Sequence, residues 1–366
     1  MKLAVTGATG FLGWHVRCHA FALGIPTVPI DRSQLSDVDT LADALADADT
    51  VVHCAGATRG TDAEVTEGIL EPARALAEAV RRVDHPVRLV YANSIHSTTD
   101  TVYGMAKRKA AELLAGSMGA PELSDVILPN LYGEHGRPYH NSFVATFCHQ
   151  LARGEQPAVR DADIGLLHAQ EAARTLIAEA AAAGHRRPRP AATPTSVREV
   201  LAALTDLATV YDAGELPDLA DEFRRSLFNT YRSYLFPDRY PIYPQRHADT
   251  RGVLVECART GGAGQAFVSS TEPGAVRGEH AHLRKLERFV VVAGAAEIAL
   301  RRLGEQRVVR FQVDGDRPAI VDIPTMWAHK LTAISPTTTV FWSSERFRPD
   351  DADTYPVAVD VDRGGR

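Results

Sequence analysis

Residues 2–13 read KLAVTGATGFLG, and this stretch decides the fold of the N-terminal half. An apolar strand over residues 2–6 runs directly into a glycine-rich turn, and a helix is expected to follow over Phe11–Ala22. Glycines in such a turn let backbone N–H groups approach a pyrophosphate and let the helix pack on the strand. The helix N-terminus would add its dipole and its free donors. The residues predicted to contact a dinucleotide here are Gly7, Thr9, Gly10, Phe11, Leu12 and Gly13.

Short apolar strands continue to alternate with amphipathic helices up to about residue 180. The pattern predicts an α/β domain of the Rossmann type, with a parallel sheet wound by helices. Residues 184–195 are rich in arginine and proline, so we expect an exposed loop there. Further strands are expected over residues 26–30, 50–53, 87–92 and 125–128, and further helices over 64–82 and 103–116.

Helical patterning stops at a proline- and aromatic-rich stretch over residues 236–244, just after helices expected over 196–207 and 219–235. Beyond it the chain is rich in short strands separated by glycine and proline turns, which predicts an all-β sandwich or small barrel. We therefore expect two domains, residues 1–243 and 244–366. The strands are expected over residues 253–257, 265–269, 289–292, 297–301, 319–323 and 338–342.

The overall composition excludes several classes of protein. A net charge of -6 over 366 residues gives no basic surface for nucleic acid, and neither a membrane span nor an export signal is evident. The 4 cysteines lie far apart without a CxxC pair, as is typical of reduced thiols. We expect a cytoplasmic protein with no nucleic-acid or membrane partner.

A candidate proton donor lies on the helix expected over residues 103–116. Tyr103 and Lys107 are four residues apart and so face the same way, and Ser94 follows the strand over residues 87–92. A neighbouring ammonium is expected to lower the pKa of the tyrosine from about 10 and make it a usable general acid.

Together with Cys54, Ala55 and Gly56 after another strand, these motifs resemble the extended short-chain dehydrogenase/reductase family over about residues 1–240. The resemblance implies that Tyr103 is the acid/base, that Ser94 holds the substrate carbonyl, and that Lys107 binds the nicotinamide ribose. It also implies cofactor contacts at Ala55 and Gly56.

Two charges at the end of the second strand give opposite signals about the cofactor. Asp31 could accept hydrogen bonds from a free ribose 2′-hydroxyl, which favours NAD, whereas Arg32 could pair with a 2′-phosphate, which favours NADP. Because the resemblance implies a biosynthetic reduction, we expect NADPH, with NADH as the alternative.

The C-terminal half contains a histidine-rich pattern that begins at Gly274. His280 and His282 are two residues apart on an expected strand, so both imidazoles enter the interior of the barrel. Glu287 and His329 complete a set of ligands suited to Zn, Mn, Fe or Ni.

The spacing of this pattern, which ends at Gly294, resembles the first cupin motif at every fixed position. The second cupin motif is matched more loosely, because Met326 stands where glycine is usual and Ala333 where asparagine often stands.

The whole chain resembles the capsule-synthesis reductases of the CapF type, which fuse these two domains. The resemblance implies a homodimer with zinc in the cupin, and a bifunctional enzyme acting on a UDP-linked 4-keto-6-deoxy amino sugar. The cupin would epimerise C3 and the other domain would reduce the C4 ketone, with Ser94, Asn130 and Asn141 as substrate-binding residues. The residues that carry the resemblance outside the generic motifs are 129–133, Tyr139, Asn141, Ser142, 145–148, Asp249, Arg251, Gly252 and 353–355.

Several points stay open at this stage. Residues 168–171 read HAQE where such reductases often carry an aromatic-Val-Asp-Asp segment, so a substrate or domain contact differs there. Lys285 is a hypothesis for the cupin base. The alternatives are a monofunctional ketosugar reductase with a structural cupin, and a dinucleotide-sensing binding protein without catalysis.

Overall fold

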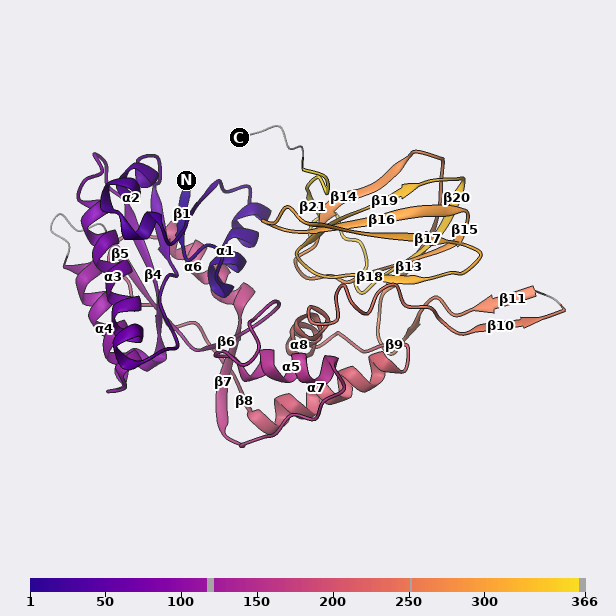
Figure 1. The fold of residues 1–366 in the computed structure, drawn as a ribbon, viewed down its shortest axis with the longest axis horizontal. Coiled ribbons are helices and arrows are strands. Elements are labelled where there is room, and N and C mark those ends of the chain that lie inside the picture. The colour runs from indigo at the N-terminus through magenta and orange to yellow at the C-terminus, as the bar shows by residue number, and fades with distance from the viewer. Residues whose placement is uncertain (117–121, 251, 362–366) are drawn as a thin grey trace. The chain divides into compact units, whose positions relative to one another are not determined.

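The computed structural model describes residues 1–116, 122–250 and 252–361, which leaves Arg251 outside the described ranges. The chain divides into two compact units (Figure 1). Unit 1 comprises Met1–Thr146 and Ala158–Val200, and unit 2 comprises Phe147–Pro157 and the chain from Leu201 onward. The domain boundary near residue 243 stays a prediction, and the helices that precede it group with unit 2.

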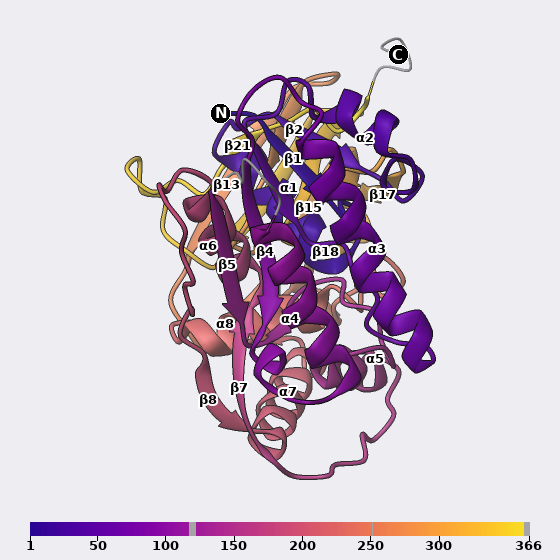
Figure 2. The same ribbon diagram turned by 90° about the vertical axis from the view of Figure 1, so that its left-hand side faces the viewer.

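Unit 1 contains a five-stranded parallel sheet in the order β2-β1-β3-β4-β5, as the alternating pattern predicts (Figure 2). A smaller sheet, β6-β7-β8, lies beyond it in the chain. The strands of the two sheets are β1 (Leu3–Thr6), β2 (Thr27–Ile30), β3 (Thr50–His53), β4 (Arg88–Ser94), β5 (Leu123–Leu128), β6 (Asn130–Tyr132), β7 (Asp163–His168) and β8 (Thr193–Ser196). The helices are α1 (Phe11–Ala22), η1 (Gln34–Ser36), α2 (Val38–Leu45), α3 (Asp62–Val80), η2 (Ile95–Thr98), α4 (Val102–Ala115), α5 (Phe143–Ala152, which continues into unit 2) and α6 (Ala169–Ala180).

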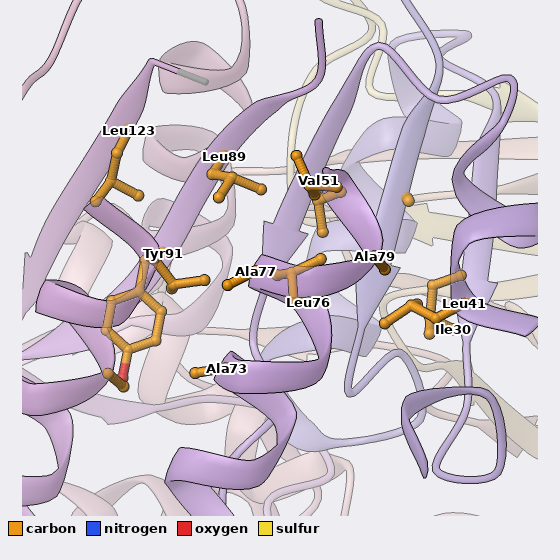
Figure 3. Packing of buried hydrophobic residues seen from close by; sticks show 14 of the residues in the cluster. Ile30, Leu41, Val51, Ala73, Leu76, Ala77, Ala79, Leu89, Tyr91 and Leu123 are labelled. Carbon is orange, nitrogen blue, oxygen red and sulfur yellow. The ribbon is translucent and has the colours of Figure 1, made fainter. Parts of the chain in front are cut away.

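Helices cover both faces of this sheet, so its central strands are buried on both sides. One face packs against α2, α3 and α4, where Leu41, Val51, Leu76 and Leu89 are fully buried (Figure 3). The other face packs against α1 and α6. Burial on two faces explains why these strands are nearly continuous runs of apolar residues.

The arginine- and proline-rich segment after α6 lacks regular secondary structure up to β8, as the loop prediction expects, but it is hydrogen-bonded to the sheet. Its backbone lies along β5, because the Arg186 carbonyl accepts from Asp125 N–H and the Pro188 carbonyl accepts from Ile127 N–H, each at 2.9 Å. Proline lacks a donor but keeps its carbonyl, so Pro188 can accept a hydrogen bond from a neighbouring strand. Residues 186–188 therefore follow the edge of β5 without forming a strand, and Arg186 and Arg187 are exposed as the loop prediction expects.

Unit 2 is built mainly from two antiparallel sheets that form an all-β cupin fold, in the orders β13-β20-β15-β18 and β17-β16-β19-β14-β21 (Figure 1). The β10-β11 hairpin and the β9-β12 pair are separate two-stranded sheets. The strands are β9 (Glu215–Leu216), β10 (Arg246–Asp249), β11 (Gly252–Val255), β12 (Arg259–Thr260), β13 (Gln265–Thr271), β14 (Val276–Ala281), β15 (Glu287–Ala293), β16 (Ala295–Arg302), β17 (Val308–Asp314), β18 (Ile320–Ile323), β19 (Trp327–Ala333), β20 (Thr337–Ser343) and β21 (Tyr355–Pro356).

Two helices of unit 2, α7 (Val197–Asp212) and α8 (Glu222–Arg232), precede the barrel in the chain. A capping box begins the helix expected over residues 196–207, since Glu199 N–H donates to Ser196 Oγ at 3.1 Å and Ser196 N–H donates to Glu199 Oε2 at 2.9 Å. The Tyr211 hydroxyl at the other end donates to Asp322, whose carboxylate also pairs with the buried Arg288 at 2.7 Å. A buried charge needs such partners, so this cluster fixes α7 against the barrel.

Helices long and apolar enough to cross a bilayer are not found among the described residues.

Candidate active site and candidate metal centre

The glycine-rich turn of unit 1 has the close backbone packing that its sequence predicts. Gly7 has φ 61° and Gly10 N–H donates to its carbonyl at 2.9 Å, so the turn is closed. A Cβ on Gly13 would lie 2.2 Å from the Gly7 carbonyl oxygen, which explains the glycine in the first turn of α1 beside Phe11 and Leu12. Side chains at Gly7 or Gly13 would therefore separate α1 from the turn.

An open cleft begins at this turn. Asp31 and Arg32 lie on its wall at the end of β2, but they are not equivalent. Asp31 Oδ1 accepts from the Ser33 hydroxyl at 2.6 Å and from Gln34 N–H at 2.9 Å, and these bonds lower the pKa of its carboxyl. Arg32 forms no ion pair with the described residues. Of the predicted cofactor residues, the cleft is lined by Gly7, Thr9, Gly10, Asp31, Arg32, Ala55 and Gly56.

The end of β4 holds Ser94 through a chain of polar side chains. Asn93 accepts from Ser94 N–H at 2.8 Å and donates to Asp125 at 2.7 Å, and Asp125 pairs with Arg187 at 3.0 Å. Ser94 Oγ in turn accepts from His96 N–H at 3.2 Å, which leaves its own proton available to another acceptor. The arginine-rich segment along β5 thus supports the strand end that carries Ser94.

Tyr103 lies in the first turn of α4, which Thr101 caps by accepting from Gly104 N–H at 3.2 Å. Its ring meets His96 edge to face, with 6.3 Å between the ring centroids. A Cβ on Gly104 would lie 2.2 Å from the His96 carbonyl oxygen, so this glycine brings α4 against the segment after Ser94. We did not single out Gly104 from the sequence, although it lies inside the YxxxK motif.

The Lys107 side chain is buried and points toward β4. Its Nζ donates to the Ala92 carbonyl at 2.7 Å and lies 4.4 Å from the centroid of the Tyr91 ring. Burial lowers the pKa of Lys107 to about 8, although the nearby Cys54 and Asp125 oppose the shift. Since Cys54 lines the cleft, the ammonium lies beside the cleft wall.

The expected lowering of the Tyr103 pKa is wrong for this conformation. Burial raises the pKa of Tyr103, and hydrogen bonding with Ser94 opposes that rise only in part. The Lys107 ammonium is directed to the Ala92 carbonyl instead and does not lower the pKa of Tyr103. The structure places Ser94 near Tyr103 and Lys107 one helical turn further along α4, and these three residues are not among those that line the cleft.

Besides Ser94, the two other predicted substrate residues, Asn130 and Asn141, lie in different surroundings. Asn141 accepts from Arg59 Nε at 3.2 Å, and Arg59 lines the cleft. Asn130 is half-buried and donates to the Gly165 carbonyl at 3.4 Å. Neither residue contacts Ser94 or Tyr103 in the described part of the chain.

The unusual residues 168–171 belong to a buried polar cluster rather than to an open surface. His168 pairs with the buried Glu134 at 3.1 Å, and Gln170 bridges Glu134 to His19 on α1 at 3.3 Å each. Burial would raise the pKa of Glu134, but His168 and His15 outweigh it and hold that pKa near 2. This cluster joins α1 to α6.

In unit 2 the structure brings the four predicted metal ligands together. The ligand atoms of His280, His282, Glu287 and His329 all lie within 4.8 Å of one another. Glu287 Oε2 is 3.1 Å from His282 Nε2 and 3.4 Å from His329 Nε2. Burial would raise the pKa of Glu287, but the two neighbouring imidazoles hold it well below its usual value.

Backbone carbonyls orient two of these imidazoles. His282 Nδ1 is 2.5 Å from the Asp353 carbonyl oxygen and His329 Nδ1 is 3.4 Å from the Trp327 carbonyl oxygen. A carbonyl only accepts, so Nδ1 carries the proton and Nε2 keeps a free lone pair. Both Nε2 atoms are buried without a hydrogen-bond partner. This donor set fits a divalent cation, whose binding would satisfy them.

Met326, which stands where the cupin motif usually has glycine, keeps the backbone conformation typical of glycine. Met326 has φ 62°, in the left-handed region that favours glycine, and its N–H donates to the His282 carbonyl at 2.6 Å. Glu279, next to His280, has φ 58° at a bulge in β14. Non-glycine residues in this region carry strain, which is common near functional sites. The turn therefore keeps its geometry despite the substitution, and a Cβ at the neighbouring Gly278 would lie 2.6 Å from the His329 carbonyl oxygen.

Comparisons with known proteins agree with both units. Residues 3–179 match the NAD dependent epimerase/dehydratase family, and residues 247–355 match the polysaccharide biosynthesis C-terminal domain. A UDP-2-acetamido-2,6-beta-L-arabino-hexul-4-ose reductase from Pseudomonas aeruginosa is 31% identical over 98% of this chain and 99% of its own. The CapF structure from Staphylococcus aureus, a capsular polysaccharide assembling protein, is 27% identical with a TM-score of 0.61, covering 98% and 100% of the two chains.

A Thermus thermophilus UDP-glucose 4-epimerase, solved in complex with NAD, shares the fold alone, at 15% identity and a TM-score of 0.52 over 65% of this chain and all of that one. The fold and the two clusters define an oxidoreductase of nucleotide sugars, in which a nicotinamide-dependent short-chain dehydrogenase/reductase unit is joined to a cupin. More particularly, the chain belongs to the CapF family.

The burial of Lys107 gives a stability profile that can be measured. Its pKa falls from 10.5 to about 8 on folding, so between these values the unfolded chain binds more protons than the folded one. We expect the free energy of unfolding of the wild type, relative to Lys107→Met, to rise by up to about 3 kcal/mol as the pH increases from 8 to 10.5. Urea denaturation across this range measures it.

Lys109→Met, which removes an exposed lysine from the same helix, is the matched control for the loss of a charge. A difference between wild type and Lys107→Met that stays constant from pH 7 to pH 10.5 would contradict the burial of the ammonium.

Proposed function

We propose that this protein epimerises C3 and then reduces the C4 ketone of a UDP-linked 2-acetamido-2,6-dideoxy-4-ketohexose. The burial of Lys107 against β4, one turn after Tyr103 on α4, is the observation that carries the proposal, since it places a phenol and an ammonium beside the strand end that carries Ser94. The substrate is taken from the name of the Pseudomonas aeruginosa relative, which matches the chain almost from end to end.

The reduction needs a hydride at C4 and a proton at its oxygen. A reduced nicotinamide in the cleft would supply the hydride. The Ser94 hydroxyl would donate to the ketone oxygen in place of its present hydrogen bond with Tyr103. Tyr103 then protonates that oxygen as the C–H bond forms. Its raised pKa keeps the phenol protonated near neutrality, as a general acid requires.

The epimerisation needs removal and return of the proton at C3, which the adjacent C4 ketone acidifies. We propose that His280, His282, Glu287 and His329 hold a divalent cation, with zinc favoured by the nitrogen-rich set. Such a cation would supply Lewis acidity to a carbonyl oxygen. Lys285 is the candidate base, since its Nζ lies 3.6 Å from Glu287 Oε1 and its side chain is mostly buried.

We propose NADPH as the cofactor. Asp31 Oδ1 is already held by Ser33 and Gln34, which leaves it less able to bind a ribose 2′-hydroxyl. Arg32 lines the same cleft without an ion-pair partner among the described residues, so its guanidinium is available to a 2′-phosphate.

The two reactions should separate cleanly by mutation. We expect Tyr103→Phe to lower the rate of ketone reduction by about 10²- to 10⁴-fold, because it removes the general acid. It should retain deuterium wash-in at C3, measured by mass spectrometry without reduced cofactor. We expect His280→Ala or Lys285→Ala to abolish wash-in while leaving reduction of the already epimerised ketosugar intact.

Each class of variant should keep one of the two reactions, and the reaction that it keeps shows that the variant is folded. Absence of wash-in in the wild type would leave a monofunctional reductase. Unchanged reduction by Tyr103→Phe would remove Tyr103 as the general acid, and absence of reduction in the wild type would favour the non-catalytic alternative. Wash-in that persists in Lys285→Ala alone would remove only the assignment of the base.

Cofactor choice gives a separate test at Arg32. We expect Arg32→Ala to raise the KM for NADPH by about 10- to 100-fold, since a hydrogen bond to a charged group contributes about 1.5–3 kcal/mol. The KM for NADH should change little. Arg81→Ala, which alters another arginine of the cleft, is the control. Equal effects of Arg32→Ala on both cofactors would contradict a 2′-phosphate contact.

We also propose a homodimer through unit 2. β13 is an edge strand of its sheet, and its Val268 is 66% exposed beside Phe267 at 43%. The β10-β11 hairpin, which projects from the barrel in Figure 1, exposes Val253 and Leu254. An exposed apolar edge strand of this kind favours pairing with a second copy.

We expect Val268→Arg to shift the protein from dimer to monomer in sedimentation velocity, because it places a charge on the proposed interface. Ile334→Arg changes an equally apolar, 57% exposed residue outside β13 and should leave the dimer intact. A wild-type protein that sediments as a monomer at micromolar concentration would contradict the proposal.

A further inference from the structure

The segment that follows β20, residues 351–360, lies across the strand that carries His280 and His282. β21 pairs with β14 there, with Pro356 opposite His280 and Tyr355 opposite Ala281 (Figure 1). Val357 N–H donates to the Glu279 carbonyl at 2.9 Å. We call residues 351–360 the C-terminal strap. None of its side chains belongs to the set of metal ligands.

Asp353 makes the closest contacts between the strap and the ligands. Its backbone carbonyl lies 2.5 Å from His282 Nδ1. Its carboxylate accepts from three successive backbone N–H groups, those of residues 283–285, at 3.1, 2.9 and 2.8 Å. These residues form the turn between His282 and Glu287, so one residue of the strap contacts a ligand and also caps the turn that connects two ligands.

Both kinds of contact made by Asp353 are suited to holding metal ligands in place. A carboxylate that accepts three N–H groups fixes the turn more firmly than neutral bonds would. A carbonyl at Nδ1 fixes the tautomer and the ring orientation of an imidazole ligand, and such outer contacts are worth about 10- to 100-fold in metal affinity. Only 7% of the Asp353 surface is exposed, so water does not replace these bonds easily.

The backbone of Asp353 is itself in an unfavourable conformation. Its φ is 43°, in the left-handed region that aspartate tolerates better than most residues but glycine tolerates best. Residues persist in this conformation when surrounding contacts over-determine it. Here the over-determining contacts are those to His282 and to the turn after it.

The neighbours of Asp353 orient the candidate base. Lys285 Nζ donates to Thr354 Oγ1 at 3.1 Å and to the Ala352 carbonyl at 3.3 Å. Three consecutive residues of the strap therefore hold His282 and Lys285 from the same side.

We propose that Asp353 is a positioning residue of the metal centre, which sets the tautomer of His282 and the geometry of the turn to Glu287. The proposal rests on the proposed metal-binding function of unit 2. The strap thereby makes the affinity of the barrel for a divalent cation depend on a segment more than 20 residues beyond the last ligand, His329.

Binding of Co²⁺ to the metal-free full-length protein tests this proposal. We expect Asp353→Ala to lower the affinity for Co²⁺, measured by competition with a chelator, by about 10- to 100-fold. It should also alter the visible d–d absorption bands, which report the ligand geometry and not the overall stability. Both variants keep the backbone carbonyl, but Asp353→Asn also keeps one side-chain acceptor oxygen for the turn, so we expect a smaller loss and a spectrum nearer the wild type.

Asp350→Asn makes the same chemical change at an exposed position nearby, where the aspartate pairs only with Arg348, and should leave affinity and spectrum unchanged. Wild-type affinity and an unchanged spectrum in both Asp353 variants would overturn the inference. Should Asp353→Ala fail to fold, wild-type behaviour of Asp353→Asn would still overturn it. Failure of the wild type to bind Co²⁺, or binding that His280→Ala leaves intact, would instead refute the metal site itself.

Discussion

Three imidazoles and one carboxylate crowd into the interior of the unit 2 barrel, with all their ligand atoms within 4.8 Å. Such a group is costly to bury unless each atom has a partner, and two of the Nε2 atoms have no hydrogen-bond partner among the described residues. The backbone around them is arranged accordingly. Carbonyls hold the outer nitrogens of His282 and His329, and residues beside the ligands adopt left-handed conformations at Glu279, Met326 and Asp353. The barrel's ordinary strand geometry is thus modified wherever it approaches this cluster.

In unit 1 the buried group that needs partners is a single charge, the Lys107 ammonium. The Lys107 ammonium is stabilised by one carbonyl and one aromatic face, and the polar groups around it continue through Asn93 and Asp125 to Arg187. Because these contacts come from β4, α4, β5 and the segment beside β5, the proposed catalytic residues depend on elements that are far apart in the sequence. The Ser94–Tyr103 contact is the product of that arrangement rather than of the YxxxK spacing alone.

Much of the fold could be predicted from the pattern of apolar and polar residues along the sequence. The strand and helix periods of unit 1 and the ligand spacing around His280 are local signals, and the structure confirms the elements and brings the four ligands together. Long-range effects were not predictable in this way. The direction of the Lys107 side chain reversed the expected shift in the Tyr103 pKa, and the role of Asp353 depends on a tail that folds back over β14. Neither contact leaves a period or a spacing in the sequence.

The segment along β5 also affects how the edge of the parallel sheet can pair with other molecules. β5 is the last strand of the parallel sheet, and an open strand edge is a template for intermolecular pairing. Residues 186–188 occupy that edge, and Pro188 and Pro190 carry no N–H donors to extend the ladder further. A run that reads as a solvated, basic linker therefore occupies part of this sheet edge, which disfavours pairing with another strand there. Replacement of these prolines would expose a new edge rather than merely loosen a loop.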